Sequence, residues 1–182
     1  MLRLTILLLL AVVTAPAMAQ APQRRAPTPT PAPQSGWGKP MVDFVAGYNA
    51  TSTRLQFDQR ARQINCDRAD GSVLTRTCLF QTSDGISLVT AAQPDRQTLR
   101  DVMVTAEGTP RGVAALFSAF LVLLTHFEPT TNTDARGAAF NALFSNPPAV
   151  GGKNETTVGR TRIAVTNLPG GVGFLLGLAP MP

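Results

Sequence analysis

The two cysteines and the single histidine are the side chains in this chain best suited to redox or metal chemistry, and their spacing limits what they can do. Cys66 and Cys78 form a C-x11-C pattern, not the C-x-x-C of thioredoxin-type redox sites. A structural zinc site uses about four ligands, and the nearest other ligand type, His126, is distant in sequence. The cysteines flank the turn dipeptide Asp70-Gly71, so they can face each other across a hairpin. We therefore predict a structural Cys66–Cys78 disulfide, worth about 3 kcal/mol, with no metal and no cofactor.

His126 is the only side chain whose ordinary pKa lies near neutrality, which makes it the default general base of a hydrolase. No G-x-S-x-G, H-E-x-x-H or calcium-loop motif accompanies it. Because it falls at the end of an apolar helix, we expect a local packing role and no catalytic residue. A carboxylate pair of the glycosidase type is the other option. The acidic residues considered for it are Asp43, Asp58, Asp101, Glu107 and Glu128, whose spacing does not single out any two.

The first 19 residues have the order of a secretory signal peptide. A short basic start ending at Arg3 is followed by an apolar run, residues 4–13, and then by the small-x-small pattern Ala17-Met18-Ala19. The apolar run is shorter than the roughly 20 residues that span a bilayer. We therefore predict cleavage after Ala19, a periplasmic or secreted location and no stable membrane span afterwards. That compartment permits disulfide formation.

Residues 20–40 are rich in Pro, Ala, Thr and Gln and show no apolar periodicity. Such a composition predicts a disordered linker with extended polyproline character. Trp37 is its only large apolar residue and could fold back onto the domain that follows. Residues 41–182 then have the length of a single folded domain.

The periodicity of that domain changes along the chain. Met41, Phe44 and Tyr48 lie on one apolar face of an expected helix, and loosely alternating runs between residues 64 and 109 predict about four strands. Residues 112–127 are apolar on every side and predict a buried central helix. A further helix within 131–148 and strands at 155–167 and 171–178 complete the expected order α-ββββ-αα-ββ. This order predicts an α+β fold, an antiparallel sheet with helices packed on one face.

The net charge of +5 comes mainly from arginine. Arginine suits carboxylate or phosphate partners, although a GC-rich genome has the same effect on composition. The arginines between residues 54 and 76 are interleaved with aspartates and lack aromatic residues for base stacking, so we expect no nucleic acid partner. An envelope protein or an acidic ligand is the expected partner. The candidate binding residues on the exposed sheet face are Arg76, Arg100, Arg160 and Arg162.

These features favour a non-enzymatic binding or accessory module of the cell envelope. One alternative is a hydrolase that uses His126 or a carboxylate pair. A second alternative is a membrane-active secreted effector that inserts residues 112–127.

Overall fold

The computed structural model describes residues 36–67, 76–93 and 97–182, all of which belong to the compact unit Pro33–Pro182. Its elements follow the chain in the order η1 (Met41–Asp43), α1 (Phe44–Arg54), β1 (Ala61–Cys66), β2 (Thr77–Thr82), β3 (Ser87–Ala92), β4 (Leu99–Glu107), α2 (Pro110–Phe127), α3 (Thr133–Phe144), β5 (Lys153–Val158), β6 (Thr161–Asn167), η2 (Pro169–Gly171) and β7 (Gly173–Pro180).

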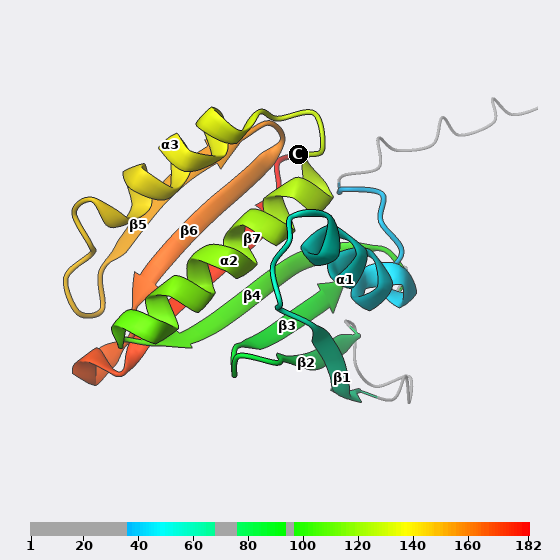
Figure 1. The fold of residues 1–182 in the computed structure, drawn as a ribbon, viewed down its shortest axis with the longest axis horizontal. Helices are drawn as coiled ribbons and strands as arrows, with labels where there is room; N and C mark the ends of the chain where they lie inside the picture. Colours follow the sequence, from blue (N-terminus) through cyan, green and yellow to red (C-terminus); the bar gives the residue numbers. More distant parts are fainter. Residues whose placement is uncertain (1–35, 68–75, 94–96) are drawn as a thin grey trace, which may run out of the picture. The chain divides into compact units, whose positions relative to one another are not determined.

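The strands form one antiparallel sheet of seven strands in the order β1-β2-β3-β4-β7-β6-β5 (Figure 1). The last strand of the chain, β7, pairs with β4 on one side and with β6 on the other. It therefore joins the meander β1–β4 to the hairpin β5–β6. The predicted α+β class with an antiparallel sheet is confirmed.

The C-terminal part contains one strand more than the order α-ββββ-αα-ββ. Residues 155–167 were expected to form one strand, but they fall in two strands, β5 and β6, which pair from Lys153↔Thr166 to Val158↔Thr161. The reversal occurs at Gly159, whose φ of 56° lies in the left-handed region that glycine adopts without steric strain. Gly159-Arg160 lacks the Asn-Gly or Asp-Gly pattern typical of tight hairpins, which is why the periodicity alone did not reveal this turn.

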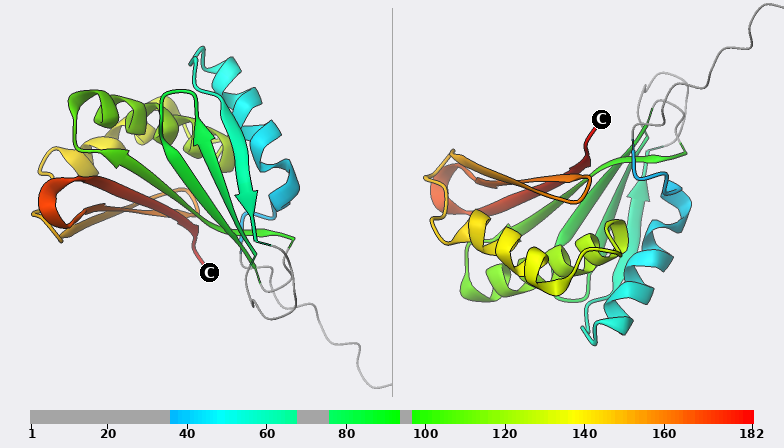
Figure 2. Two further views of the ribbon diagram at one scale, coloured as in Figure 1. Left: turned by 90° about the horizontal axis from the view of Figure 1, so that it is seen from below. Right: turned by 90° about the horizontal axis from the view of Figure 1, so that it is seen from above.

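The three α-helices cover the same face of the sheet (Figure 2). α2 packs on β4, α3 packs on β5, and α1 contacts both β1 and α2. Thr109 caps α2 by accepting a hydrogen bond from the Gly112 amide, and Pro110 occupies the first turn, where its missing N–H is tolerated. The buried residues of α2 are Ala115, Leu116, Ala119, Phe120, Val122, Leu123, Leu124, Thr125 and Phe127. Within the described ranges, α2 is the one helix long and apolar enough to cross a membrane, and here it forms the centre of the core.

Residues just before η1 are held against the domain. The Trp37 ring stacks on Phe127 with 3.9 Å between centroids, and its Nε1 donates a hydrogen bond to Thr161 Oγ1 at 2.8 Å. The Leu99 amide donates to the Lys39 carbonyl at 2.8 Å. The packed chain therefore begins before Met41, and Trp37 folds back onto the domain even though it lies in the stretch assigned to the linker.

The predicted disulfide is present. Cys66 on β1 and Cys78 on β2 are register partners with 4.0 Å between their Cα atoms, and their sulfur atoms are bonded. That separation lies well inside the limit of about 7 Å for a bridge without backbone movement. The turn expected at Asp70-Gly71 lies outside the described residues.

Candidate functional site

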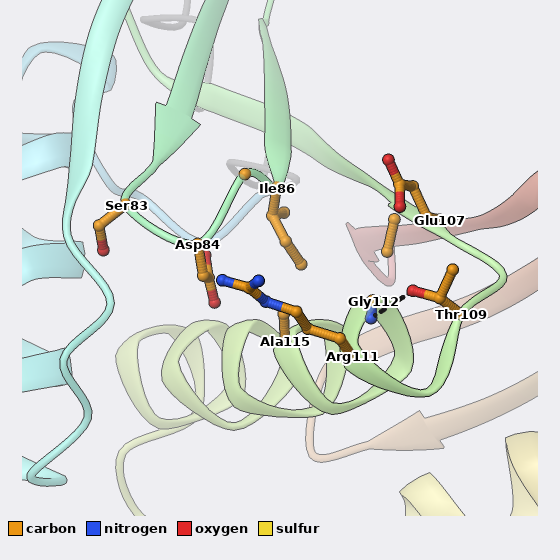
Figure 3. Close-up of a pocket in the computed structure, with 10 residues that line it drawn as sticks. Ser83, Asp84, Ile86, Glu107, Thr109, Arg111, Gly112 and Ala115 are labelled. Carbon is orange, nitrogen blue, oxygen red and sulfur yellow. Dashed lines mark hydrogen bonds between the residues drawn. The ribbon is translucent and has the colours of Figure 1, made fainter.

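A polar groove lies where α2 begins, between the β2–β3 turn and the end of β4 (Figure 3). Its volume is about 390 Å³, in the range of small-molecule sites. A second hollow of about 290 Å³ shares Ser83, Asp84 and Arg111 with it, so the two form one depression. Glu107 lines the first hollow and Asp58 the second.

Asp84 is the most firmly positioned carboxylate in this groove. It lies in the turn between β2 and β3, followed by Gly85 with a φ of 88°. Thr82 Oγ1 donates a hydrogen bond to Asp84 Oδ1, and Gln59 Nε2 donates to Oδ2 at 2.6 Å. Both carboxylate oxygens are therefore held by donors from the protein.

Asp84 is held in place by a buried hydrogen-bond network at the floor of the groove, centred on Gln59. Gln59 is 3 % exposed, and its Oε1 accepts a hydrogen bond from the Tyr48 hydroxyl on α1. Gln59 Nε2 also donates to the Ala115 carbonyl of α2 at 3.2 Å. Burial, and then the charge of Asp84, raise the pKa of Tyr48, which keeps its hydroxyl protonated as a donor. The network thus ties α1, α2 and the β2–β3 turn together at the floor of the groove.

Arg111 extends over the groove toward Asp84 (Figure 3). It lies in the first turn of α2, where the positive end of the helix dipole disfavours a cation. In the described part of the chain the ion pairs are Arg100–Asp101 and Lys153–Glu155, so Arg111 has no carboxylate within ion-pair distance there. Its guanidinium is available to an acidic group of a ligand.

The hydroxyl groups that line the groove are engaged by groups of the protein backbone. Ser83 Oγ donates to the Asp58 carbonyl at 2.9 Å and accepts from the Arg60 amide at 3.1 Å, and Thr109 Oγ1 caps α2. The third hydroxyl, Ser118 Oγ, donates to the Ala114 carbonyl at 3.3 Å, so all three are occupied by local backbone groups. Neither histidine nor cysteine is among the residues that line the two hollows. A nucleophile with an adjacent base, as acyl transfer needs, is not assembled from the groove's lining.

His126 lies away from the groove, in the contact between α1 and α2. Its imidazole lies so close to Gly47 that a Cβ at that position would clash with the ring. Burial, and then the charges of Lys39 and Arg54, lower the pKa of His126 to about 4, so its ring is neutral at pH 7. The described residues contain no cluster of three or more metal-binding side chains. The expected local role for His126 fits this position.

The candidate arginines do not form one cluster. Arg162 on β6 and Asp101 on β4 border a shallow hollow on the face of the sheet opposite the helices, and Arg100 pairs with Asp101 there at 2.7 Å. Arg160 lies in the β5–β6 turn, where its amide donates to Glu128 Oε1. Arg76 precedes β2. Of the four candidate arginines, Arg162 alone is among the residues that line this hollow, and Arg100 reaches it only through its ion pair with Asp101.

Of the acidic candidates, Glu107 and Asp58 reach the groove, each in a different hollow. The sequence reasoning did not select Asp84 or Arg111 as site residues. In the sequence, Asp84-Gly85 has the form of a turn dipeptide and carries no further signal. The available signal was Arg111, a cation directly after the helix-starting Pro110, because that position disfavours positive charge.

Comparison of the chain with protein-family models, with curated proteins and with solved structures finds no match. The function must therefore be inferred from the geometry of the site.

Proposed function

We propose that this protein is an exported, non-enzymatic binding module of the cell envelope, and that it holds an acidic ligand in the groove at the start of α2. The observation that carries the proposal is Arg111, an arginine without an ion pair among the described residues at the dipole-disfavoured end of α2. Local preferences are typically violated at functional sites. Export is supported by the order of the first 19 residues and by the Cys66–Cys78 disulfide.

The groove defines the chemistry of the ligand. A guanidinium binds a carboxylate or phosphate through charge-assisted, often bidentate hydrogen bonds. The carboxylates of Asp58, Asp84 and Glu107 also line the two hollows, and they suit N–H or O–H donors of the same ligand. We therefore assign an acidic ligand that also carries hydrogen-bond donors.

The other functions considered from the sequence have less support. Asp84 has both oxygens hydrogen-bonded, whereas a catalytic carboxylate must exchange a proton or attack the substrate. His126 packs against Gly47 away from the groove. Insertion of α2 into a membrane would remove its buried residues from the centre of the core.

Solution NMR tests the binding site. Isotope-labelled protein is titrated with acidic amino acids, sugar acids and short acidic peptides, and backbone amide shifts are mapped. We expect shifts at Asp84, Gly85 and Gly112, and Arg111→Gln should weaken binding about 10- to 100-fold, the worth of a charged hydrogen bond. The matched control is Arg62→Gln, which removes an exposed arginine of β1 that does not line the groove. Equal weakening by both variants, or shifts confined to other surfaces, would contradict the groove assignment.

Intact-mass measurement of the protein from the exported fraction tests the compartment. We expect a chain that begins at Gln20. A mature chain that still begins at Met1 would contradict export with cleavage.

A further inference from the structure

The face of the sheet opposite the helices carries a row of mostly apolar residues. All three α-helices lie on the other face (Figure 2). Strand register aligns the row from β2 to β6, and its members are Leu79, Val89, Met103, Gly177 and Ala164. Leu79 is 38 % exposed and Met103 is 37 % exposed. Exposed apolar residues that line up across several strands are typical of an interaction surface.

On this face, the side chain of Met103 on β4 lies beside a hollow above Gly177 on β7. Met103 on β4 is directly opposite Gly177 on β7. A Cβ placed on Gly177 would have no atom within 4 Å, so the surface above it is open. The hollow has a volume of about 210 Å³ and is bordered by Met103, Ala164 and Ala179. Each chain therefore carries an exposed methionine side chain and, next to it, an apolar hollow that can accept the same side chain of a second copy.

We propose that two copies of this chain pack face to face through this open face, with Met103 of each copy filling the hollow above Gly177 of the other. A two-fold axis parallel to the strands, between β4 and β7, exchanges the two positions. Adjacent strands lie about 4.8 Å apart and packed sheets about 10 Å apart, so a methionine side chain reaches the facing hollow. Closed two-fold interfaces of this kind are self-complementary.

Two charged residues that border the hollow, Asp101 and Arg162, are also brought near their counterparts by this two-fold axis. The other two, Lys153 and Glu155, pair with each other. Asp101 lies two residues before Met103 on β4, and Arg162 on β6 is opposite Ala179 on β7. The axis places each Arg162 within about one strand spacing of the other copy's Asp101. Asp101 has a side chain that is 24 % exposed. Its Oδ2 pairs with Arg100, and its Oδ1 is buried and has no hydrogen-bond partner among the described residues.

Arg162, unlike Asp101, belongs to neither ion pair in the described part of the chain. A second copy supplies Met103 for the hollow, Asp101 for Arg162 and Arg162 for Asp101. We therefore propose a second copy as the partner that covers this face. The groove assigned above starts at the opposite end of β4 and under α2, so this inference is independent of the proposed function.

Sedimentation velocity over a concentration series tests the proposal, with protein purified from the fraction in which it accumulates. We expect a dimer, and Met103→Glu should raise the dimer dissociation constant at least about 30-fold, as loss of a hot spot does. Val42→Glu is the matched control, because Val42 is 76 % exposed on η1, and it should leave the dimer unchanged. A monomer at all concentrations, or a dimer that Met103→Glu does not weaken, overturns the proposal.

A charge exchange tests the orientation. Asp101→Arg and Arg162→Asp should each weaken the dimer about tenfold, and the double variant should recover most of that loss, because the exchanged charges again face each other. Failure of the double variant to recover overturns the two-fold arrangement. Deletion of residues 20–35 should leave the dimer intact. Loss of the dimer on this deletion overturns the proposal, because the open face alone would then not hold the two copies together.

Discussion

Lowering the pH should destabilise the protein through protonation of His126, and a substitution of this residue should remove that part of the pH dependence. The imidazole is packed between α1 and α2 against Gly47, near the ring of Phe127. Burial, and then the charges of Lys39 and Arg54, disfavour its protonated form and lower its pKa from 6.5 to about 4. We predict that His126→Gln flattens the dependence of unfolding free energy on pH between those two values.

The sign and size follow from proton linkage. Between pH 6.5 and about 4 the unfolded chain binds a proton at His126 that the folded chain does not bind. The folded state therefore loses stability as the pH falls through this window, by at most about 1.4 kcal/mol per pH unit. Because part of the imidazole meets water, screening reduces this effect, and we expect about 1–2 kcal/mol between pH 7 and pH 4.5.

Urea unfolding at pH 7 and pH 4.5 measures the effect in the wild type and in His126→Gln. Carboxylates that titrate in the same range contribute equally to both proteins and cancel in the comparison. The wild type should lose about 1–2 kcal/mol more than the variant. Equal losses in both proteins would refute the reasoning, because the folded state would then accept the proton as readily as the unfolded chain.

Further predictions concern the disulfide, a glycine and the N-terminal contact. Cys66→Ala with Cys78→Ala should lower the unfolding free energy by about 3 kcal/mol, and non-reducing peptide mapping should recover one linked pair. Gly47→Ala should destabilise by about 1 kcal/mol by chemical denaturation, since overpacking against the imidazole outweighs the gain in helix propensity. In a background without that imidazole the same change should stabilise instead. Trp37→Ala should lower stability by about 2–4 kcal/mol, whereas deletion of residues 20–35 should leave the melting temperature within a few degrees.

The layout of the fold was predictable where the periodicity is long or the turn chemistry is explicit. Residues 112–127, which are apolar on every side of a helix, predicted the central helix, and α2 spans Pro110–Phe127. Asp84-Gly85 marked the β2–β3 turn. The hairpin at Gly159-Arg160 was missed because its turn depends on a left-handed glycine within an otherwise continuous strand-like stretch.

The candidate site was less predictable, because it depends on contacts between distant segments. Gln59 is an unremarkable polar residue in the sequence, but in the fold it links Tyr48 to Asp84 beneath the groove. Arg111 carried a local signal, its place in the first turn of α2. Only the fold shows that the turn containing Asp84 faces it. The disulfide was predictable because two cysteines allow a single intramolecular pairing.

Photo-crosslinking in intact cells tests the central claim, ligand binding in the groove, most directly. A photoreactive amino acid replaces Ser83, which lines both hollows and is exposed, or Ala142 on the exposed surface of α3 as the matched control. The account predicts a discrete adduct at position 83 that is lost when Arg111→Gln is added, and no such adduct at position 142. No adduct at position 83, or the same adduct from both positions, would contradict it.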